Sequence, residues 1–246
     1  MAHYKVILTY DGTDFQGFQR QVEGRTVQAS VEAALERIGW QESSILFAGR
    51  TDAGVHAAGQ VIGFNLDWKH SPEELQDAVN ANLPVDVSAL SVAEAEENFH
   101  PRFSAVARCY HYRIFCEPVR QPLRERYAWR VWPAVRTKPL EETADYLIGR
   151  HDFSAFGSAP QEGGTTIREI FSSIWKVLEN DLVFQITGNA FLYRMVRRLV
   201  SFQIEVGQGK RNPEEIKLFL DGGSKEVVQG LAPPQGLVLE EVFYPK

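Results

Sequence analysis

The order of apolar and polar positions in residues 1–104 predicts a strand, a helix, two strands, a second helix and a last strand. Alternating apolar residues indicate strands, and apolar residues three and four apart indicate helices. The predicted strands are 4–10, 44–48, 60–66 and 87–93, and the predicted helices are 26–38 and 71–80. Thr26 and Ser71 can cap these helices by accepting a hydrogen bond from the first turn. The order β-α-β-β-α-β is that of a ferredoxin-like unit.

Residues 105–246 repeat this order with longer connections. The predicted strands are 106–115, 167–177, 182–187 and 237–244, and the predicted helices are 139–148, 191–206 and 213–220. We therefore expect an α+β protein made of two ferredoxin-like halves, residues 1–104 and 105–246. The halves are expected to lie side by side in one continuous, mostly antiparallel sheet with helices on one face.

Charge is unevenly distributed along this chain. The formal net charge of −6 over 246 residues argues mildly against a nucleic-acid partner. Residues 101–138, however, hold nine Lys or Arg and only two Glu. A basic segment on an acidic body is typical of a protein that binds phosphates locally.

The cysteines and the first residues indicate the compartment. Cys109 and Cys116 are seven positions apart in one predicted strand, so they point to opposite faces and can share neither a disulfide nor a metal. The chain begins with a polar sequence rather than an apolar signal, and no apolar run is long enough to span a membrane. We expect a cytoplasmic protein without a membrane partner.

The stretch 47–60 concentrates residues that can carry chemistry. Arg50 and Asp52 lie among three glycines, and their two-residue spacing places both side chains on one face of an extended segment. A carboxylate beside a guanidinium stays ionised and can act as a nucleophile or a base. From this stretch alone, a structural ion pair that closes a glycine turn is the better interpretation.

Other segments change that balance, because together with this stretch they resemble the TruA-type tRNA pseudouridine synthases. The similar segments are GRTDAGVHA at 49–57, YDGTDFQGFQRQ at 10–21, RCYHY at 108–112, HDF at 151–153 and GNAFLYRMVR at 188–197. They occur in the family's order along nearly the whole chain. The resemblance implies an isomerase that makes pseudouridine at positions 38, 39 and 40 of the tRNA anticodon arm. It also implies a homodimer, and a reaction that needs no cofactor and no metal.

The resemblance also assigns roles to individual residues. It makes Asp52 the catalytic carboxylate, and whether Asp52 adds to C6, attacks C1′ or removes the C2′ proton stays open. It singles out Tyr110 to replace the stacking that an extruded base loses, a contact worth roughly 1–3 kcal/mol. It makes Arg197 the buried partner of Asp52, and Arg50 is expected to bind substrate as well.

Several further arginines are expected to contact RNA. Arg194, Arg197 and Arg198 would share one face of the helix predicted at 191–206. The segment 120–133 is predicted to be a long, exposed connection with many basic residues. The expected RNA-binding residues are Arg20, Arg108, Arg120, Arg124, Arg126, Arg194 and Arg198.

Two other functions fit parts of the sequence. Two ferredoxin-like halves also describe a tandem RNA-binding module without catalysis, although the aromatic pattern of such modules is missing. A metal-dependent phosphotransferase could use Asp11, Asp14 and Asp52, yet no phosphate-cradling motif accompanies these acids.

Overall fold

The computed structural model describes residues 1–159, 163–220 and 226–245. The chain divides into two compact units, one made of Met1–Val106 with Val238–Lys246 and the other of Ala107–Leu237. Both units combine a mostly antiparallel sheet with helices that pack on it, so the expected α+β class is confirmed.

The first unit is built on four strands in the order β4-β1-β3-β10. Strand β1 pairs antiparallel with both β3 and β4, and β10 pairs parallel with β3. The strands are β1 (Ala2–Tyr10), β2 (Leu46–Phe47), β3 (His56–Leu66), β4 (Val87–Glu94) and β10 (Leu237–Phe243), and β2 adds to β3. The last strand of the chain thus belongs to the sheet of the first unit.

Both helices of the first unit begin where their capping residues predict. Helix α1 (Val27–Glu36) follows Thr26, whose side chain accepts a hydrogen bond from the Ala29 amide. Helix α2 (Pro72–Asn82) follows Ser71, which forms a reciprocal capping box with Glu74. These caps satisfy amides that have no partner inside the helix.

The second unit has the strand order β5-β9-β8-β7, paired antiparallel throughout. Its strands are β5 (Ala107–Phe115), β6 (Trp129–Arg130), β7 (Gly149–Asp152), β8 (Ile167–Leu178) and β9 (Asp181–Gly188). Its helices are α3 (Thr137–Asp145), α4 (Met195–Gly207) and α5 (Glu215–Leu220), with single 3₁₀ turns at Ser154–Phe156 and Pro234–Gly236. The short strands β6 and β7 were not expected, because two to four residues show no readable period.

Helix α4 begins later than the periodicity predicts. It starts at Met195 rather than at residue 191, because Arg194 has a left-handed backbone with φ of 62°. The preceding residue, Tyr193, bridges to Ser158 instead of joining the helix. Cys109 and Cys116 form no disulfide with each other.

Candidate catalytic loop and substrate-binding residues

The Asp52 loop, residues 49–55, is a tight turn held by backbone hydrogen bonds. The Val55 amide donates to the Asp52 carbonyl at 3.1 Å, which closes a four-residue turn. Gly54 occupies its third position with φ of 76°, as a type II turn requires. The turn leaves Asp52 half-buried, with its carboxylate on a fixed piece of backbone.

The Asp52 loop is braced by the bracing block, which we define as residues 10–18. Thr51 is buried, and its hydroxyl lies 2.8 Å from the Tyr10 hydroxyl. The Phe18 amide donates to the Thr51 carbonyl at 3.1 Å, and the Gly54 amide donates to the Phe15 carbonyl at 3.2 Å. Both segments resemble the same family in sequence, and these hydrogen bonds show that they also contact each other directly.

Two glycines allow the bracing block to approach the Asp52 loop. A Cβ on Gly12 would lie 2.0 Å from the Val55 carbonyl oxygen, far inside contact distance. A Cβ on Gly17 would lie 2.9 Å from the Thr51 carbonyl oxygen, and Gly17 also has a positive φ of 98°. Glycine is needed at both positions because the two backbones touch.

Asp11 and His56 belong to this scaffold. The Asp11 carboxylate accepts hydrogen bonds from the amide and hydroxyl of Thr13, so it shapes the turn as an aspartate commonly does. His56 is buried, and its Nδ1 accepts a hydrogen bond from the Gly12 amide at 3.0 Å. The Nδ1 of His56 also lies 3.2 Å from Asp11 Oδ1.

The expected proximity of Arg50 to Asp52 stays a prediction. Arg50 is exposed at the start of the Asp52 loop, and the chain enters the turn at Asp52. A structural Arg50–Asp52 pair that closes the loop is the alternative to a catalytic role of Asp52.

In the second unit, strand β5 carries two tyrosines with different surroundings. Tyr112 is fully buried and its hydroxyl donates to the Pro233 carbonyl, while burial raises its pKa well above the ordinary value. Tyr110 is half-buried, and its ring meets Phe191 edge to face at a centroid distance of 5.1 Å. Tyr112 is a core residue, whereas Tyr110 is partly accessible and held in one orientation. Arg108, two residues before Tyr110, donates to the Asn189 carbonyl at 2.9 Å.

The arginines around the start of α4 do not share one face. Arg194 precedes the helix, is exposed and stacks over the Tyr193 ring at 4.7 Å. Arg197 is buried, and its Nε donates to the Ala232 carbonyl at 2.8 Å. Arg198 is half-buried and reaches the Phe156 carbonyl at 3.3 Å. The predicted common face fails because Arg194 lies outside the helix.

Several of the expected RNA-binding arginines are engaged within the protein. Arg20 donates to the buried Glu32 carboxylate at 2.8 Å and to the Ser43 carbonyl at 3.1 Å. Arg124 pairs with Asp181 and lies over the Phe115 ring at 4.2 Å. These two side chains are therefore not simply available to RNA, as the sequence suggested.

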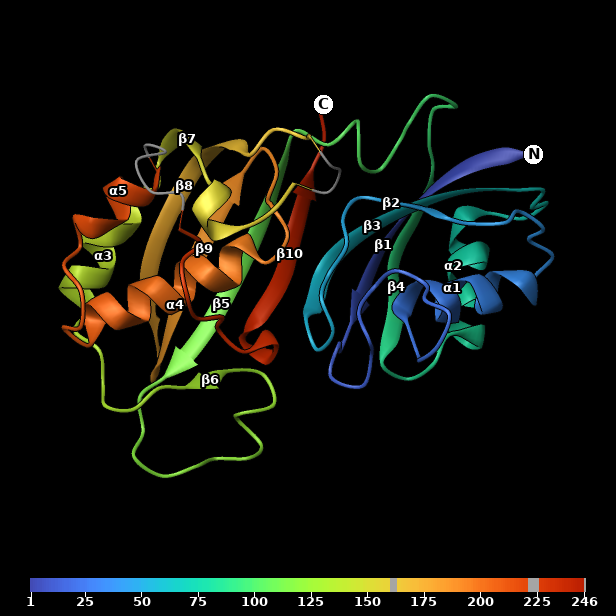
Figure 1. The fold of residues 1–246 in the computed structure, drawn as a ribbon. Coiled ribbons are helices and arrows are strands. Elements are labelled where there is room, and N and C mark those ends of the chain that lie inside the picture. The colour runs from blue at the N-terminus through green and yellow to red at the C-terminus, as the bar shows by residue number, and fades with distance from the viewer. Residues whose placement is uncertain (160–162, 221–225, 246) are drawn as a thin grey trace. The chain divides into compact units, whose positions relative to one another are not determined.

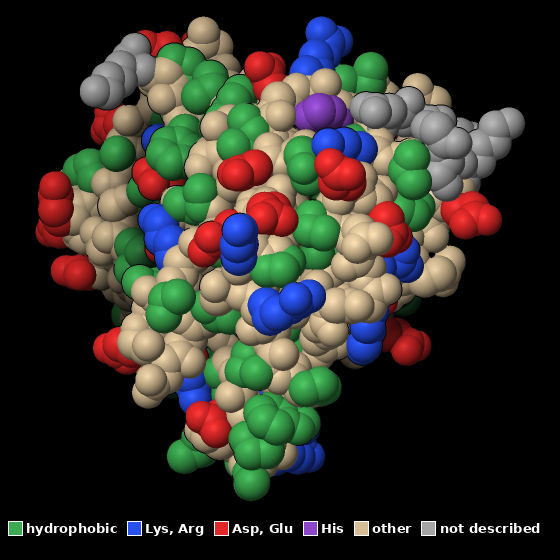
Figure 2. Space-filling model, turned by 90° about the vertical axis from the view of Figure 1, so that its left-hand side faces the viewer, with side chains coloured by type: hydrophobic (Ala, Val, Ile, Leu, Met, Phe, Trp, Pro, Cys, Tyr) green, Lys and Arg blue, Asp and Glu red, His purple; other side chains and the backbone are tan. Residues whose placement is uncertain are grey.

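Two further arginines of the long connection are exposed. Arg120 pairs with Glu125 at 3.0 Å, and Arg126 lies beside the Tyr127 ring. On the face shown in Figure 2, Lys and Arg side chains are interspersed with Asp and Glu rather than forming one continuous area.

Two general features of the described residues bear on function. Among residues 1–159, 163–220 and 226–245, no three His, Cys, Asp or Glu side chains come together as metal ligands would. Within the same residues, every helix is too short or too polar to cross a membrane.

A family model described as tRNA pseudouridine synthase matches residues 6–104 and 143–245 of the chain. The chain belongs to the tRNA pseudouridine synthase family. It is thus an isomerase that acts on tRNA, and neither a catalytically silent RNA-binding module nor a phosphotransferase fits this membership. The resemblance noted on short segments is confirmed over most of the sequence.

Close relatives of this pseudouridine synthase match over their full length. Each is called tRNA pseudouridine synthase A. The protein of Bacillus pumilus (strain SAFR-032) is 40% identical over 242 residues, which cover 98% of both chains. That of Syntrophotalea carbinolica is 39% identical, over 99% of this chain and 97% of the relative. That of Thermotoga sp. (strain RQ2) is 38% identical, over 99% and 100%.

Among solved structures, a Cbf5-Nop10-Gar1 complex matches at 10% identity with a TM-score of 0.36. The match covers 82% of this chain and 45% of that one. A likeness of this size adds nothing to the assignment, which depends on the family model and the relatives.

Proposed function

We propose that this tRNA pseudouridine synthase modifies uridines at positions 38, 39 and 40 of the anticodon arm, with Asp52 as the catalytic carboxylate. The observation that carries the proposal is the Asp52 loop. The loop is braced by the contact between the Tyr10 and Thr51 hydroxyls and by backbone hydrogen bonds with Phe15 and Phe18, which fix the position of the half-buried Asp52. Such preorganisation is what a reacting group needs.

The reaction itself explains why one carboxylate suffices. The C1′–N1 bond of uridine breaks, the base turns, and a new bond joins C1′ to C5. The hydrogen on C5 leaves as a proton and N1 gains one, so no electrons are exchanged and no cofactor is consumed. Asp52 acts at the sugar or at the base, and the protein has to hold the detached uracil between the two bond changes.

Tyr110, Arg197 and Arg50 complete the proposed substrate-binding set. Tyr110 is half-buried with its ring edge to face against Phe191, and stacking of such a ring on a flipped base is worth roughly 1–3 kcal/mol. The Arg197 Nε donates a hydrogen bond to the Ala232 carbonyl, which fixes the direction of the guanidinium. We propose that this guanidinium is the partner of the Asp52 carboxylate. Arg50 is exposed on the Asp52 loop and is assigned to the RNA backbone.

The position of the modified uridines is tested by tritium release from tRNA labelled with [5-³H]uridine. Purified enzyme should release tritium from a tRNA with uridine at 38, 39 or 40, and release should stop when all three positions are cytidine. Continued release from that cytidine-substituted tRNA would refute the assignment of positions. EDTA, in monovalent salt that keeps the tRNA folded, should leave the rate unchanged, because no metal takes part.

We further propose a homodimer that works in the cytoplasm. A second copy would double the surface available to one tRNA, which an acidic chain needs. Light scattering should give twice the chain mass of 27.8 kDa. A monomer that is fully active at low concentration would refute the dimer, and recovery of the protein in a membrane fraction would refute the location.

A further inference from the structure

The second unit contains a buried arginine that lacks an acidic partner. Arg168, on β8, is only 8% exposed, yet it forms no ion pair with any described residue. Its Nη1 donates to the carbonyls of Thr165 at 2.9 Å and Ile167 at 2.6 Å, while no described acceptor meets its Nε. Burial lowers the pKa of the Arg168 guanidinium. A buried cation is costly unless something compensates it.

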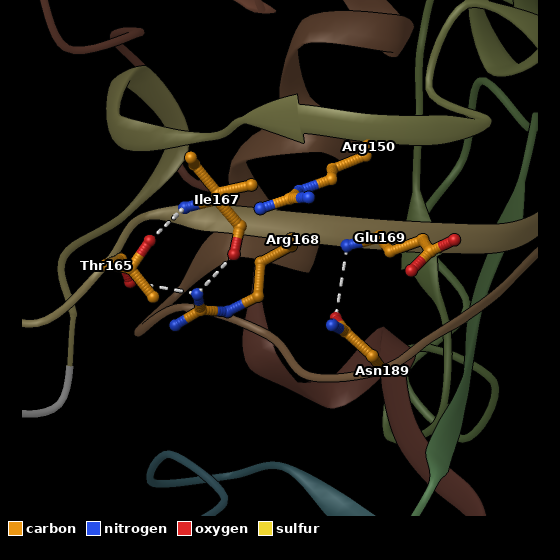
Figure 3. Close-up of a pocket in the computed structure, with 6 residues that line it drawn as sticks. All are labelled: Arg150, Thr165, Ile167, Arg168, Glu169 and Asn189. Atoms are coloured by element: carbon orange, nitrogen blue, oxygen red, sulfur yellow. Dashed lines mark hydrogen bonds between the residues drawn. The ribbon is translucent and has the colours of Figure 1, made fainter.

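Arg168 lines a pocket of about 280 Å³ (Figure 3). The lining residues are Arg150, Thr165, Ile167, Arg168, Glu169 and Asn189. The Glu169 carboxylate points away from the Arg168 guanidinium, as strand alternation requires of neighbouring residues (Figure 3). Arg150 stands directly opposite Glu169 in the strand register, so these two exposed side chains are neighbours on the face away from Arg168. Arg168 is therefore the guanidinium of this lining that no carboxylate faces.

The polar groups of the pocket are mostly donors. The Glu169 backbone amide donates a hydrogen bond to Asn189 Oδ1 at 3.1 Å, so the NH₂ group of Asn189 can donate to a ligand. In Arg168 the two carbonyls hold Nη1, so the opposite edge, formed by Nε and Nη2, remains for a ligand. That edge of a guanidinium matches two oxygens of a phosphate. An anion with several acceptor oxygens satisfies all these donors together.

We propose that this pocket binds one phosphodiester of the RNA substrate, with Arg168 as the buried bidentate contact. The proposal rests on the proposed function, because the phosphodiester belongs to the tRNA. The same chemistry would accept free inorganic phosphate, so the experiment separates the two sources.

The test measures the salt dependence of tRNA binding for Arg168→Met. This variant should flatten the slope of log K against log salt by roughly 0.7–0.9, the contribution of one phosphate contact. Arg211→Met is the matched control, because Arg211 is neutralised by Glu205 and Glu215, and its slope should equal that of the wild type. An unchanged slope in folded Arg168→Met would overturn the proposal.

Two further measurements keep the result clear. Wild-type tritium release is measured first, so a protein that releases none refutes the proposed function, while an active protein with unchanged variant slopes refutes only the phosphate site. If Arg168→Met does not fold, Arg168→Lys decides, because lysine keeps the charge and loses the bidentate edge. This variant should bind tRNA more weakly than the wild type, and equal binding would overturn the proposal. Phosphate raises the Tm of proteins generally, so its effect is compared between wild type and Arg168→Met at equal ionic strength. A larger rise in the wild type, together with an unchanged salt slope of tRNA binding in Arg168→Met, would assign the pocket to free phosphate instead of RNA.

Discussion

The Asp52 loop and the basic connection at 116–136 are both rich in charge, but they are held differently. The Asp52 loop is fixed mainly through its backbone, by amides and carbonyls of the bracing block. The basic connection, which runs between β5 and α3 (Figure 1), pairs through its backbone at β6 but also uses its charged side chains, as Arg124 binds Asp181 and Arg120 binds Glu125. Side chains that already support the fold are not simply free for a substrate.

This difference limits what a count of charges along the sequence can predict about RNA contacts. The excess of positive charge at 101–138 is real, but Arg124 lies against Asp181 and Arg130 reaches Glu125 at 3.5 Å. By contrast, Arg168 lies outside that segment and forms no ion pair with described residues. The partner of an arginine, more than its position in a basic run, decides whether it can bind RNA.

Removing the backbone support of the Asp52 loop should have the largest effect. In Gly12→Ala the new Cβ would lie 2.0 Å from the Val55 carbonyl oxygen, so the loop or the bracing block must move. We expect a loss of about 1–3 kcal/mol in unfolding free energy, the usual cost of overpacking, together with a large fall in turnover. Urea denaturation and tritium release measure the two effects.

Gly49→Ala is the control for stability, because a Cβ at Gly49 meets nothing within 4 Å and the residue has no positive φ. It should unfold like the wild type. Wild-type stability and turnover in Gly12→Ala would show that the close approach of the two segments does not hold the loop.

Breaking the side-chain support of the basic connection should cost less. Arg124→Met removes the nearer partner of Asp181, whose side chain is only 12% exposed, while Arg113 remains 3.3 Å away. We expect a loss of about 1–2 kcal/mol, because a charge-assisted bond is removed and part of it is compensated. The salt slope of tRNA binding should stay unchanged for the folded protein.

Arg120→Met provides the comparison, since the Arg120 side chain is 73% exposed. Its effect on unfolding should stay below about 1 kcal/mol, as for most surface pairs. A flattened salt slope in Arg124→Met, with stability intact, would restore Arg124 as an RNA contact and remove the contrast between the two regions.

The smallest expected effect concerns pH and the Arg25–Asp86 pair of the first unit. Arg25 donates to both carboxylate oxygens of Asp86, and this hydrogen bonding lowers the Asp86 pKa below its ordinary value. Stability from a carboxyl with a lowered pKa is fully present above the unfolded pKa of about 3.9 and is lost as pH falls through the folded pKa. The pair is partly exposed, so it contributes roughly 0.2–1 kcal/mol.

Thermal unfolding of wild type and Asp86→Asn between pH 3 and pH 7 checks this. The Tm difference should be constant above about pH 5 and shrink below about pH 4. A difference that grows on acidification would mean that the pair does not stabilise the fold.

The sequence predicted most elements of the fold because their signals are local. Ser71 with Glu74 marks the start of α2, and the alternating residues of β1 mark its buried face. The start of α4 was missed because a left-handed Arg194 is set by tertiary contacts, which no periodicity shows. The short β7 was missed because it exists only through pairing with β8.

The sequence predicted the residues of the candidate site but not the contacts that hold them in place. Asp52 and Tyr110 came from a family resemblance, whereas the hydrogen bond between Tyr10 and Thr51 joins positions 41 residues apart and leaves no local signal. Arg168 was overlooked, although one signal was present. It shares a strand face with the buried Ile170, and a charge on an apolar face indicates either a partner or a ligand.

The central claim is that Asp52 is the catalytic carboxylate and that the bracing block holds it in position. Asp52→Asn keeps the size of the side chain but removes its charge and its nucleophile. The matched control is Asp77→Asn, an exposed acid on α2 that should leave turnover, binding and stability unchanged. Both variants are compared with the wild type for folding by thermal unfolding and for tRNA binding by filter retention.

The deciding measurement is tritium release from [5-³H]uridine-labelled tRNA in a single turnover with enzyme in excess. The account predicts that Asp52→Asn folds and binds tRNA like the wild type but releases no tritium above background. Release at a rate near that of the wild type would contradict the assignment of Asp52 as the catalytic carboxylate, and an unfolded Asp52→Asn protein would instead give Asp52 a structural role.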